Sequence, residues 1–397
     1  MEARVPLRNF WGRARLTGSL ASVTLLAVCG ILFHAEARAE MMAPRHNVLE
    51  FPRPVSIEPN VKFWVDVFTS YSERDFVVHD KDNIWRIYQV LHIPGDGSPT
   101  GQDVEWANTY LKAKYADILN RLASGHPPAT YEEQRIAALF KGEHYPNYAG
   151  AAQNLRVQQG MAEQFRTNLV RARIYLPNIE RVFNSLGLPV GLALLPTVES
   201  GFHPYARSKA GAAGLWQFTR ATGKQYMTVS GYRDDRLDPV RATEAAAQLL
   251  LHNHELLGDW PLAITAYNYG TGGMMQAVES TGGGDYSQVF RRYDGPHFGF
   301  ASKNYYSEFL AALQVYQFRN AYFPGIDQEQ PDYYEHYYEP PPPPVEHVRY
   351  TRHWHRGSVR RVAMSGRGGR HHVHRAVYHG RSRRHLRTAG ADEFVVD

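Results

Sequence analysis

The chain has 397 residues and a formal net charge of +5, and this length suffices for two modest hydrophobic cores with extensions. Its one cysteine excludes an intramolecular disulfide framework and a zinc site built from cysteines. The positive charge belongs to the ends of the chain, because residues 345–390 contain twelve Arg against one Glu while residues 40–344 are net acidic.

The N-terminus has the pattern of a secretory signal peptide. Four arginines precede a largely apolar run over residues 16–33, and Ala37-Arg38-Ala39 offers a cleavage site of the small-x-small type. Residues 1–39 are therefore predicted to direct export to the periplasm or cell envelope. The apolar run also approaches the length of a membrane span, and Cys29 lies in a partial match to a lipoprotein processing box. An uncleaved anchor and a lipid anchor thus remain open as forms of membrane association.

The body of the chain has the pattern of successive amphipathic helices. Thr130 with Glu133 forms a capping box, Asp238 and Asp259 are predicted N-caps, and Pro177 is expected to separate or kink two helical segments. Apolar residues recur at helical spacing over residues 103–124, 130–142, 160–176, 178–186, 239–257, 259–267 and 302–316. No convincing run of alternating strand residues is found. The predicted fold class is mainly α, with an N-terminal helical region over residues 40–160 and a second helical domain over residues 161–325.

The composition changes after residue 325. Residues 326–397 are predicted to form a Pro-rich spacer and an Arg/His-rich tail, disordered from residue 331, because such a sequence buries too little apolar area to offset chain entropy. The arginines are expected to adhere to anionic envelope polymers or lipids. Eight histidines in residues 345–390 leave metal binding open. Nucleic acid is not an expected partner, since an exported chain seldom meets it.

One carboxyl residue lies in an unusual sequence context. Glu199 follows the apolar stretch Leu194-Leu195-Pro196-Thr197-Val198 and precedes Ser200. Burial of such a carboxyl raises its pKa, which is what a general acid at neutral pH requires. The alternative is a glutamate at a helix end that points to water.

Two further short motifs follow. Residues 208–218 read SKAGAAGLWQF, in which Trp216 offers a flat face for a sugar ring and Gln217 a donor and an acceptor for its substituents. The alternative is a Gly-rich turn with one core Trp. Ala266-Tyr267-Asn268 lies at a predicted helix end before Gly270, and its alternative is an ordinary C-terminal turn.

The order Glu-Ser, Gly-Leu-x-Gln, Ala-Tyr-Asn resembles the family 1 lytic transglycosylases, the goose-lysozyme-like enzymes that cleave murein. The sequence GLPVGLALLPTVESGFHPYA, residues 187–206, is similar to the membrane-bound transglycosylase D branch. Trp216 is a departure, since Met often stands before the Gln in the family. The resemblance implies a lysozyme-like catalytic domain over residues 161–325, with Glu199 catalytic and with the substrate-binding residues Ser200, Trp216, Gln217, Tyr267, Asn268 and Tyr305. Tyr306 is a less well aligned alternative to Tyr305.

The resemblance also implies a reaction. Glu199 protonates the β-1,4 oxygen between N-acetylmuramic acid and N-acetylglucosamine, and the muramoyl C6 hydroxyl then closes onto C1 to give a 1,6-anhydro end. Glycan strands of peptidoglycan are the implied partner, and neither a cofactor nor a metal is expected. Two alternatives remain open: a hydrolytic muramidase, which would need a second carboxylate, and a catalytically silent peptidoglycan-binding scaffold.

Overall fold

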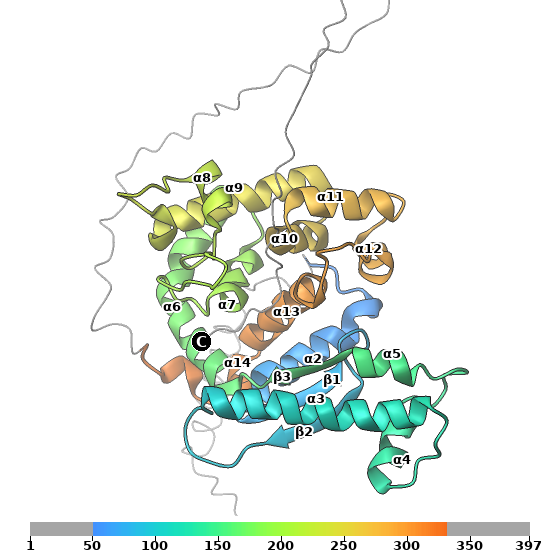
Figure 1. Ribbon diagram of the computed structural model, residues 1–397. Helices are drawn as coiled ribbons and strands as arrows, with labels where there is room; N and C mark the ends of the chain where they lie inside the picture. The colour runs from blue at the N-terminus through green and yellow to red at the C-terminus, as the bar shows by residue number, and fades with distance from the viewer. Residues whose placement is uncertain (1–50, 332–397) are drawn as a thin grey trace, which may run out of the picture.

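The computed structural model describes residues 51–331, which fold around two hydrophobic cores (Figure 1). Its helices are α2 (Glu58–Thr69), α3 (Gly101–Ala123), α4 (Tyr131–Ala138), α5 (Tyr148–Gln153), α6 (Ala162–Ser185), α7 (Leu195–Glu199), α8 (Arg220–Tyr226), α9 (Pro239–Leu257), α10 (Trp260–Tyr269), α11 (Thr271–Ser280), α12 (Tyr286–Arg292), α13 (Phe300–Gln317) and α14 (Arg319–Tyr322). The mainly α prediction is confirmed. The predicted signal peptide, Cys29 and the Arg/His-rich tail lie outside the described residues.

The structure contains a small sheet that no sequence pattern indicated. Three antiparallel strands, β1 (Asp75–Asp80), β2 (Ile87–His92) and β3 (Leu155–Gln159), form a sheet of order β2-β1-β3 within the predicted N-terminal helical region. The central strand β1 is buried on both faces, so its sequence shows no alternation, and β3 is short and polar. Strand β1 therefore lacks the period-2 pattern by which a strand is recognised, and β3 alternates over only four residues, Leu155-Arg156-Val157-Gln158.

The sheet lies between two helices (Figure 1). Phe76 and Val78 face α3 and share the smaller core with its residues Leu111 and Tyr115, whereas Val77 on the opposite face belongs to the larger core with α2. This alternation is what the pleat of a strand dictates. Residues 51–160, the N-terminal unit, are therefore packed against the rest of the described chain through the larger core.

Most helix boundaries follow the predicted caps. Thr130 and Glu133 form a reciprocal capping box at α4, and Asp238 and Asp259 accept backbone N–H groups at the starts of α9 and α10. Helix α4 ends at Ala138, short of the predicted residue 142. Helix α6 runs through Pro177 without a break, so the predicted pair of segments is one helix.

The described chain has an N-terminal half, residues 51–160, and a C-terminal half, residues 161–331. Helix α13 is central to the arrangement because it contacts α2 of the N-terminal half as well as α7 and α10 of its own half (Figure 1). Asn60 of α2 donates a hydrogen bond of 2.8 Å from Nδ2 to Asn304 Oδ1, both side chains being buried. Phe309 packs against Phe51 with 5.0 Å between ring centroids. Among residues 51–331, no helix combines the length and apolar character that crossing a bilayer requires.

Candidate active site

A short buried helix positions Glu199. Leu195, Pro196 and Thr197 of α7 are buried, and Glu199 ends the helix with an intermediate exposure. The chain then turns sharply through Gly201 and Phe202, at φ values of 59° and 60°. A Cβ atom at Gly201 would lie 2.4 Å from Asn168 Oδ1, so the turn requires glycine there. The carboxyl is thereby held at the edge of the larger core with one side open.

The Glu199 carboxyl accepts a hydrogen bond at Oε1 from the Tyr305 hydroxyl. Burial raises the pKa of Glu199 from its usual 4.5 to about 7, and the Tyr305 hydrogen bond acts in the opposite direction. The group is thus about half protonated near neutral pH, so it can both release and recover a proton there. The pKa of Glu199 is thus raised, in the direction that its apolar sequence context predicts.

Two tyrosines stay neutral beside this carboxyl. Burial and the Glu199 charge together hold the phenol pKa of both Tyr267 and Tyr305 well above the usual 10. Tyr267 donates a 2.8 Å hydrogen bond to the Trp216 carbonyl oxygen. The alternative residue Tyr306 is fully buried and donates to the Pro52 carbonyl oxygen at 2.7 Å, which excludes it from the site.

Ser200 ties α7 to the loop of residues 208–218. Its Oγ donates to the Leu215 carbonyl oxygen at 2.7 Å and accepts the His203 N–H at 3.2 Å. Because the Ser200 hydroxyl proton is donated to Leu215, this side chain fixes the backbone next to Glu199. These contacts suit Ser200 to orienting Glu199 rather than to contacting a sugar.

Gln217 occupies a strained position in the same loop. Its φ is 47°, in the left-handed region, and its Nε2 donates to the carbonyl oxygens of Gly214 (2.8 Å) and Ala206 (3.3 Å). Gly214 is required because a Cβ there would lie 1.7 Å from the Arg236 carbonyl oxygen. The side-chain carbonyl oxygen of Gln217 is therefore the part of the amide left for a ligand.

The prediction that Trp216 stacks on a sugar is wrong. Its side chain has 0% exposure, its Nε1 donates to Thr243 Oγ1 at 2.9 Å, and its ring lies 5.7 Å from that of Phe183. An indole enclosed on all sides cannot offer a face to a ligand. The alternative interpretation, a core Trp beneath a Gly-rich turn, is the one that the structure supports.

Asn268 lies where the end of α10 meets the start of α13. Its Oδ1 accepts a 2.7 Å hydrogen bond from Ser302 Oγ, and its side chain keeps an intermediate exposure. This contact orients the amide so that Nδ2 is the group able to donate to a ligand. The sequence motif placed Asn268 correctly at a helix end, with Gly270 just beyond it.

Sequence reasoning missed a second carboxyl residue, Glu308. It lies three positions after Tyr305 on α13, hence on the same helix face, and its charge interacts with that of Glu199. Burial, opposed by Arg156 of β3 and reinforced by Glu199, raises the pKa of Glu308 to about 8. The spacing from Tyr305 was the signal that could have identified it.

The other acidic candidates are used elsewhere. Asp238 caps α9, Asp234 pairs with Arg236 at 2.7 Å, and Asp235 pairs with Arg233 at 2.5 Å. Within residues 51–331, no group of three His, Cys, Asp or Glu side chains is arranged to hold a metal ion. The polar groups gathered at this site are therefore the Glu199 and Glu308 carboxyls, the phenols of Tyr267 and Tyr305, and the amides of Gln217 and Asn268.

Comparison with known proteins agrees with this geometry. Residues 185–290 match the family model of the Transglycosylase SLT domain. The chain carries an SLT domain. It contains Glu199, Gln217 and Asn268, while Tyr305 and Glu308 follow it on α13. The resemblance to the lytic transglycosylases, including the D branch, is confirmed over this part of the chain.

Several relatives of this chain bear transglycosylase names. A membrane-bound lytic murein transglycosylase D of Escherichia coli K12 is 34% identical over 139 residues, which cover 33% of this chain and 31% of that protein. A membrane-bound lytic murein transglycosylase F of Aeromonas salmonicida is 34% identical over 193 residues, covering 45% of this chain and 35% of that protein. The chain thus spans about a third of the length of each of these relatives.

A third relative extends over more of both chains. A membrane-bound lytic murein transglycosylase C of Haemophilus influenzae is 27% identical over 254 residues, covering 55% of this chain and 69% of that protein.

Proposed function

We propose that this chain is a peptidoglycan lytic transglycosylase of the cell envelope, which cleaves the bond between N-acetylmuramic acid and N-acetylglucosamine and forms 1,6-anhydro ends. The observation that carries the proposal is the Glu199 carboxyl, whose pKa of about 7 lets one group act as acid and then as base. The names of the relatives and the SLT domain support the same reaction class.

The reaction has two proton transfers through the same group. Protonated Glu199 donates its hydrogen to the glycosidic oxygen, and the bond from that oxygen to C1 of the muramic acid breaks. The Glu199 carboxylate then removes the proton of the muramoyl C6 hydroxyl, whose oxygen bonds to C1. No water is consumed, and the carboxyl ends as it began. The intramolecular nucleophile avoids the entropy of capturing a second molecule.

The neighbouring residues have supporting roles in this reaction. The neutral Tyr305 phenol donates to Glu199 Oε1 and stabilises the ionised carboxylate, and the Tyr267 phenol donates to the Trp216 carbonyl oxygen. The Gln217 side-chain oxygen and the Asn268 Nδ2 group are proposed to hold the N-acetyl amides of the two sugars. Ser200 is a positioning residue in this scheme, and Trp216 has no part in sugar binding.

The raised pKa of Glu308 argues for this reaction and against hydrolysis by a pair of carboxylates. A second carboxyl that acts as nucleophile or base must be ionised before the bond breaks. The pKa of Glu308 is raised to about 8, so this group stays mostly protonated at neutral pH. A silent scaffold is also disfavoured, because a scaffold gains nothing from a carboxyl whose ionisation is opposed by burial.

The end group of the product tests the proposal. The purified chain is incubated with sacculi, and soluble fragments are analysed by mass spectrometry, with Glu199→Gln as the matched inactive variant. Anhydro ends are expected from the wild type and no release from the variant. Reducing ends, each one water heavier, would establish hydrolysis instead, and binding to sacculi without release would establish a scaffold.

A further inference from the structure

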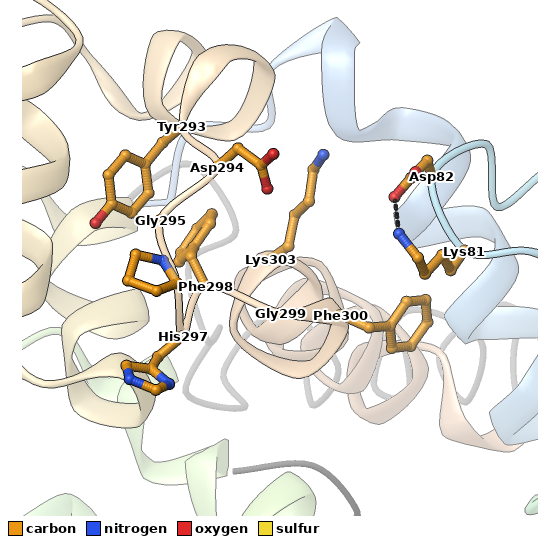
Figure 2. A pocket seen from close by; sticks show the side chains of 11 residues that line it. Lys81, Asp82, Tyr293, Asp294, Gly295, His297, Phe298, Gly299, Phe300 and Lys303 are labelled. Carbon is orange, nitrogen blue, oxygen red and sulfur yellow. Dashed lines mark hydrogen bonds and ion pairs between the residues drawn. The ribbon is translucent and has the colours of Figure 1, made fainter. Parts of the chain in front are cut away.

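A cavity separate from the Glu199 carboxyl lies between the two halves of the molecule (Figure 2). Its volume is about 350 Å³, and its walls are the turn after β1 on one side and residues 293–303, which lead into α13, on the other. Four charged residues line it: Lys81 and Asp82 from the turn, Asp294 from the loop, and Lys303 from α13. The volume is within the range of small-ligand sites, and the charges of both signs indicate a polar ligand.

The charges in this cavity are only partly used within the protein. Lys81 Nζ pairs with Asp82 Oδ1 at 2.9 Å, with both side chains more than 40% exposed, an arrangement that contributes little to stability. Lys303 Nζ lies 5.3 Å from the centroid of the Phe290 ring. Within residues 51–331, neither Lys303 nor Asp294 forms an ion pair, although both side chains extend into the same space in Figure 2.

The cavity adjoins the candidate active site through two contacts. Tyr293 lines the cavity, and its hydroxyl lies 3.2 Å from that of Tyr269, the residue after Asn268. Ser302, which precedes Lys303, donates to Asn268 Oδ1. Two side-chain contacts therefore connect the wall of the cavity with the Asn268 region.

We infer that this cavity binds the peptide that murein carries on the lactyl group of N-acetylmuramic acid. The inference rests on the proposed function, since the peptide is attached to the same sugar whose C1 would react. Stem peptides contain acidic residues and a diamino acid, which carries an ammonium group beside a carboxylate. Lys303 and Lys81 match the carboxylates, and Asp294 matches the ammonium group. A cavity of about 350 Å³ holds one or two residues of such a peptide, but not a glycan strand.

This inference gives the N-terminal unit a role in substrate selection. Lys81 belongs to the turn between β1 and β2, whereas Lys303 belongs to α13, so the cavity exists only when the two halves are packed together. One contact between the two halves lies at the cavity wall, where the Arg156 guanidinium of β3 is 4.2 Å from the centroid of the Phe300 ring, and Phe300 lines the cavity.

Paired substrates test the inference. Wild type, Lys81→Glu and Lys303→Ala are compared on intact sacculi and on the same sacculi after an amidase has removed the peptides. Lys112→Glu, at an exposed position of α3 outside the cavity, is the matched control. Loss of a charge-assisted contact is expected to lower kcat/KM on intact sacculi about tenfold. On stripped glycan the same variants should stay within about twofold of wild type, and Lys112→Glu should match wild type on both.

A binding measurement separates this inference from the proposed reaction. The free tetrapeptide Ala-Glu-diaminopimelate-Ala is titrated into the full chain and followed by NMR. Saturable binding by wild type that Lys81→Glu abolishes would support the cavity as a peptide site even if no muropeptide is released, in which case the proposed reaction alone fails. Equal losses on both sacculus preparations, or no loss from Lys81→Glu on intact sacculi, would overturn the inference.

Discussion

The Glu199→Gln variant should be more stable than the wild type at alkaline pH and equally stable at acid pH. Burial moves the carboxyl pKa from 4.5 to about 7 in the folded protein. Because the pKa is raised, the folded state binds the proton more tightly than the unfolded state does. Below pH 4.5 the carboxyl is protonated in both states and its burial does not lower the free energy of unfolding. Between pH 4.5 and 7 the carboxyl ionises more readily in the unfolded state, so the free energy of unfolding falls as the pH rises and levels off above pH 7.

The magnitude follows from the size of the pKa change. One pKa unit corresponds to about 1.4 kcal/mol, so the shift from 4.5 to about 7 corresponds to at most about 3.5 kcal/mol. The partial exposure of Glu199 allows water to screen the charge, which reduces the expected gain for the variant to about 1–2 kcal/mol at pH 8. Glutamine has nearly the same shape as the protonated acid, so the variant should equal the wild type at pH 4.

Urea unfolding at pH 4 and pH 8 measures this difference. Glu255→Gln, at an exposed position on α9, is the control for the removal of one carboxyl group outside the site. If Glu199→Gln changed the free energy of unfolding equally at pH 4 and pH 8, the carboxyl would not be desolvated. The argument for Glu199 as an acid at neutral pH would then fail.

Three further predictions concern neighbouring residues. Tyr305→Phe removes the hydrogen bond that stabilises the Glu199 carboxylate, so the alkaline limb of the pH–rate profile should move upward by about one unit; an unchanged limb would show that this bond does not tune the acid. Glu308→Gln should keep the rate at pH 7 within about threefold, because Gln mimics the protonated form, whereas a loss above about a hundredfold would identify Glu308 as an essential carboxylate. Trp216→Phe should lower the free energy of unfolding by about 1–3 kcal/mol through the lost Thr243 hydrogen bond and packing, while KM for glycan stays constant. A raised KM with an unchanged free energy of unfolding would show that Trp216 contacts the sugar.

Local sequence was sufficient for the helices α9 and α10 and for the buried Glu199 carboxyl. Caps such as Asp238 and Asp259 act within one turn, so a few neighbouring residues determine where α9 and α10 begin. The same holds for Glu199, because a carboxyl after a run of apolar residues is drawn into the core with its helix. Its raised pKa is thus a consequence of its immediate context.

Long-range packing decided the rest. The pairing of β1 with β3 joins segments about 80 residues apart, and the two-sided burial of β1 removes the alternation that would have marked it. Whether Trp216 faces a sugar or the core depended on Thr243 and Phe183, which no local pattern associates with it. The partnership of Glu308 with Glu199, and the cavity between Lys81 and Lys303, exist only where α13 meets α7 and the sheet. Local sequence therefore determined which groups are present, and the packing of distant elements determined which of them face one another.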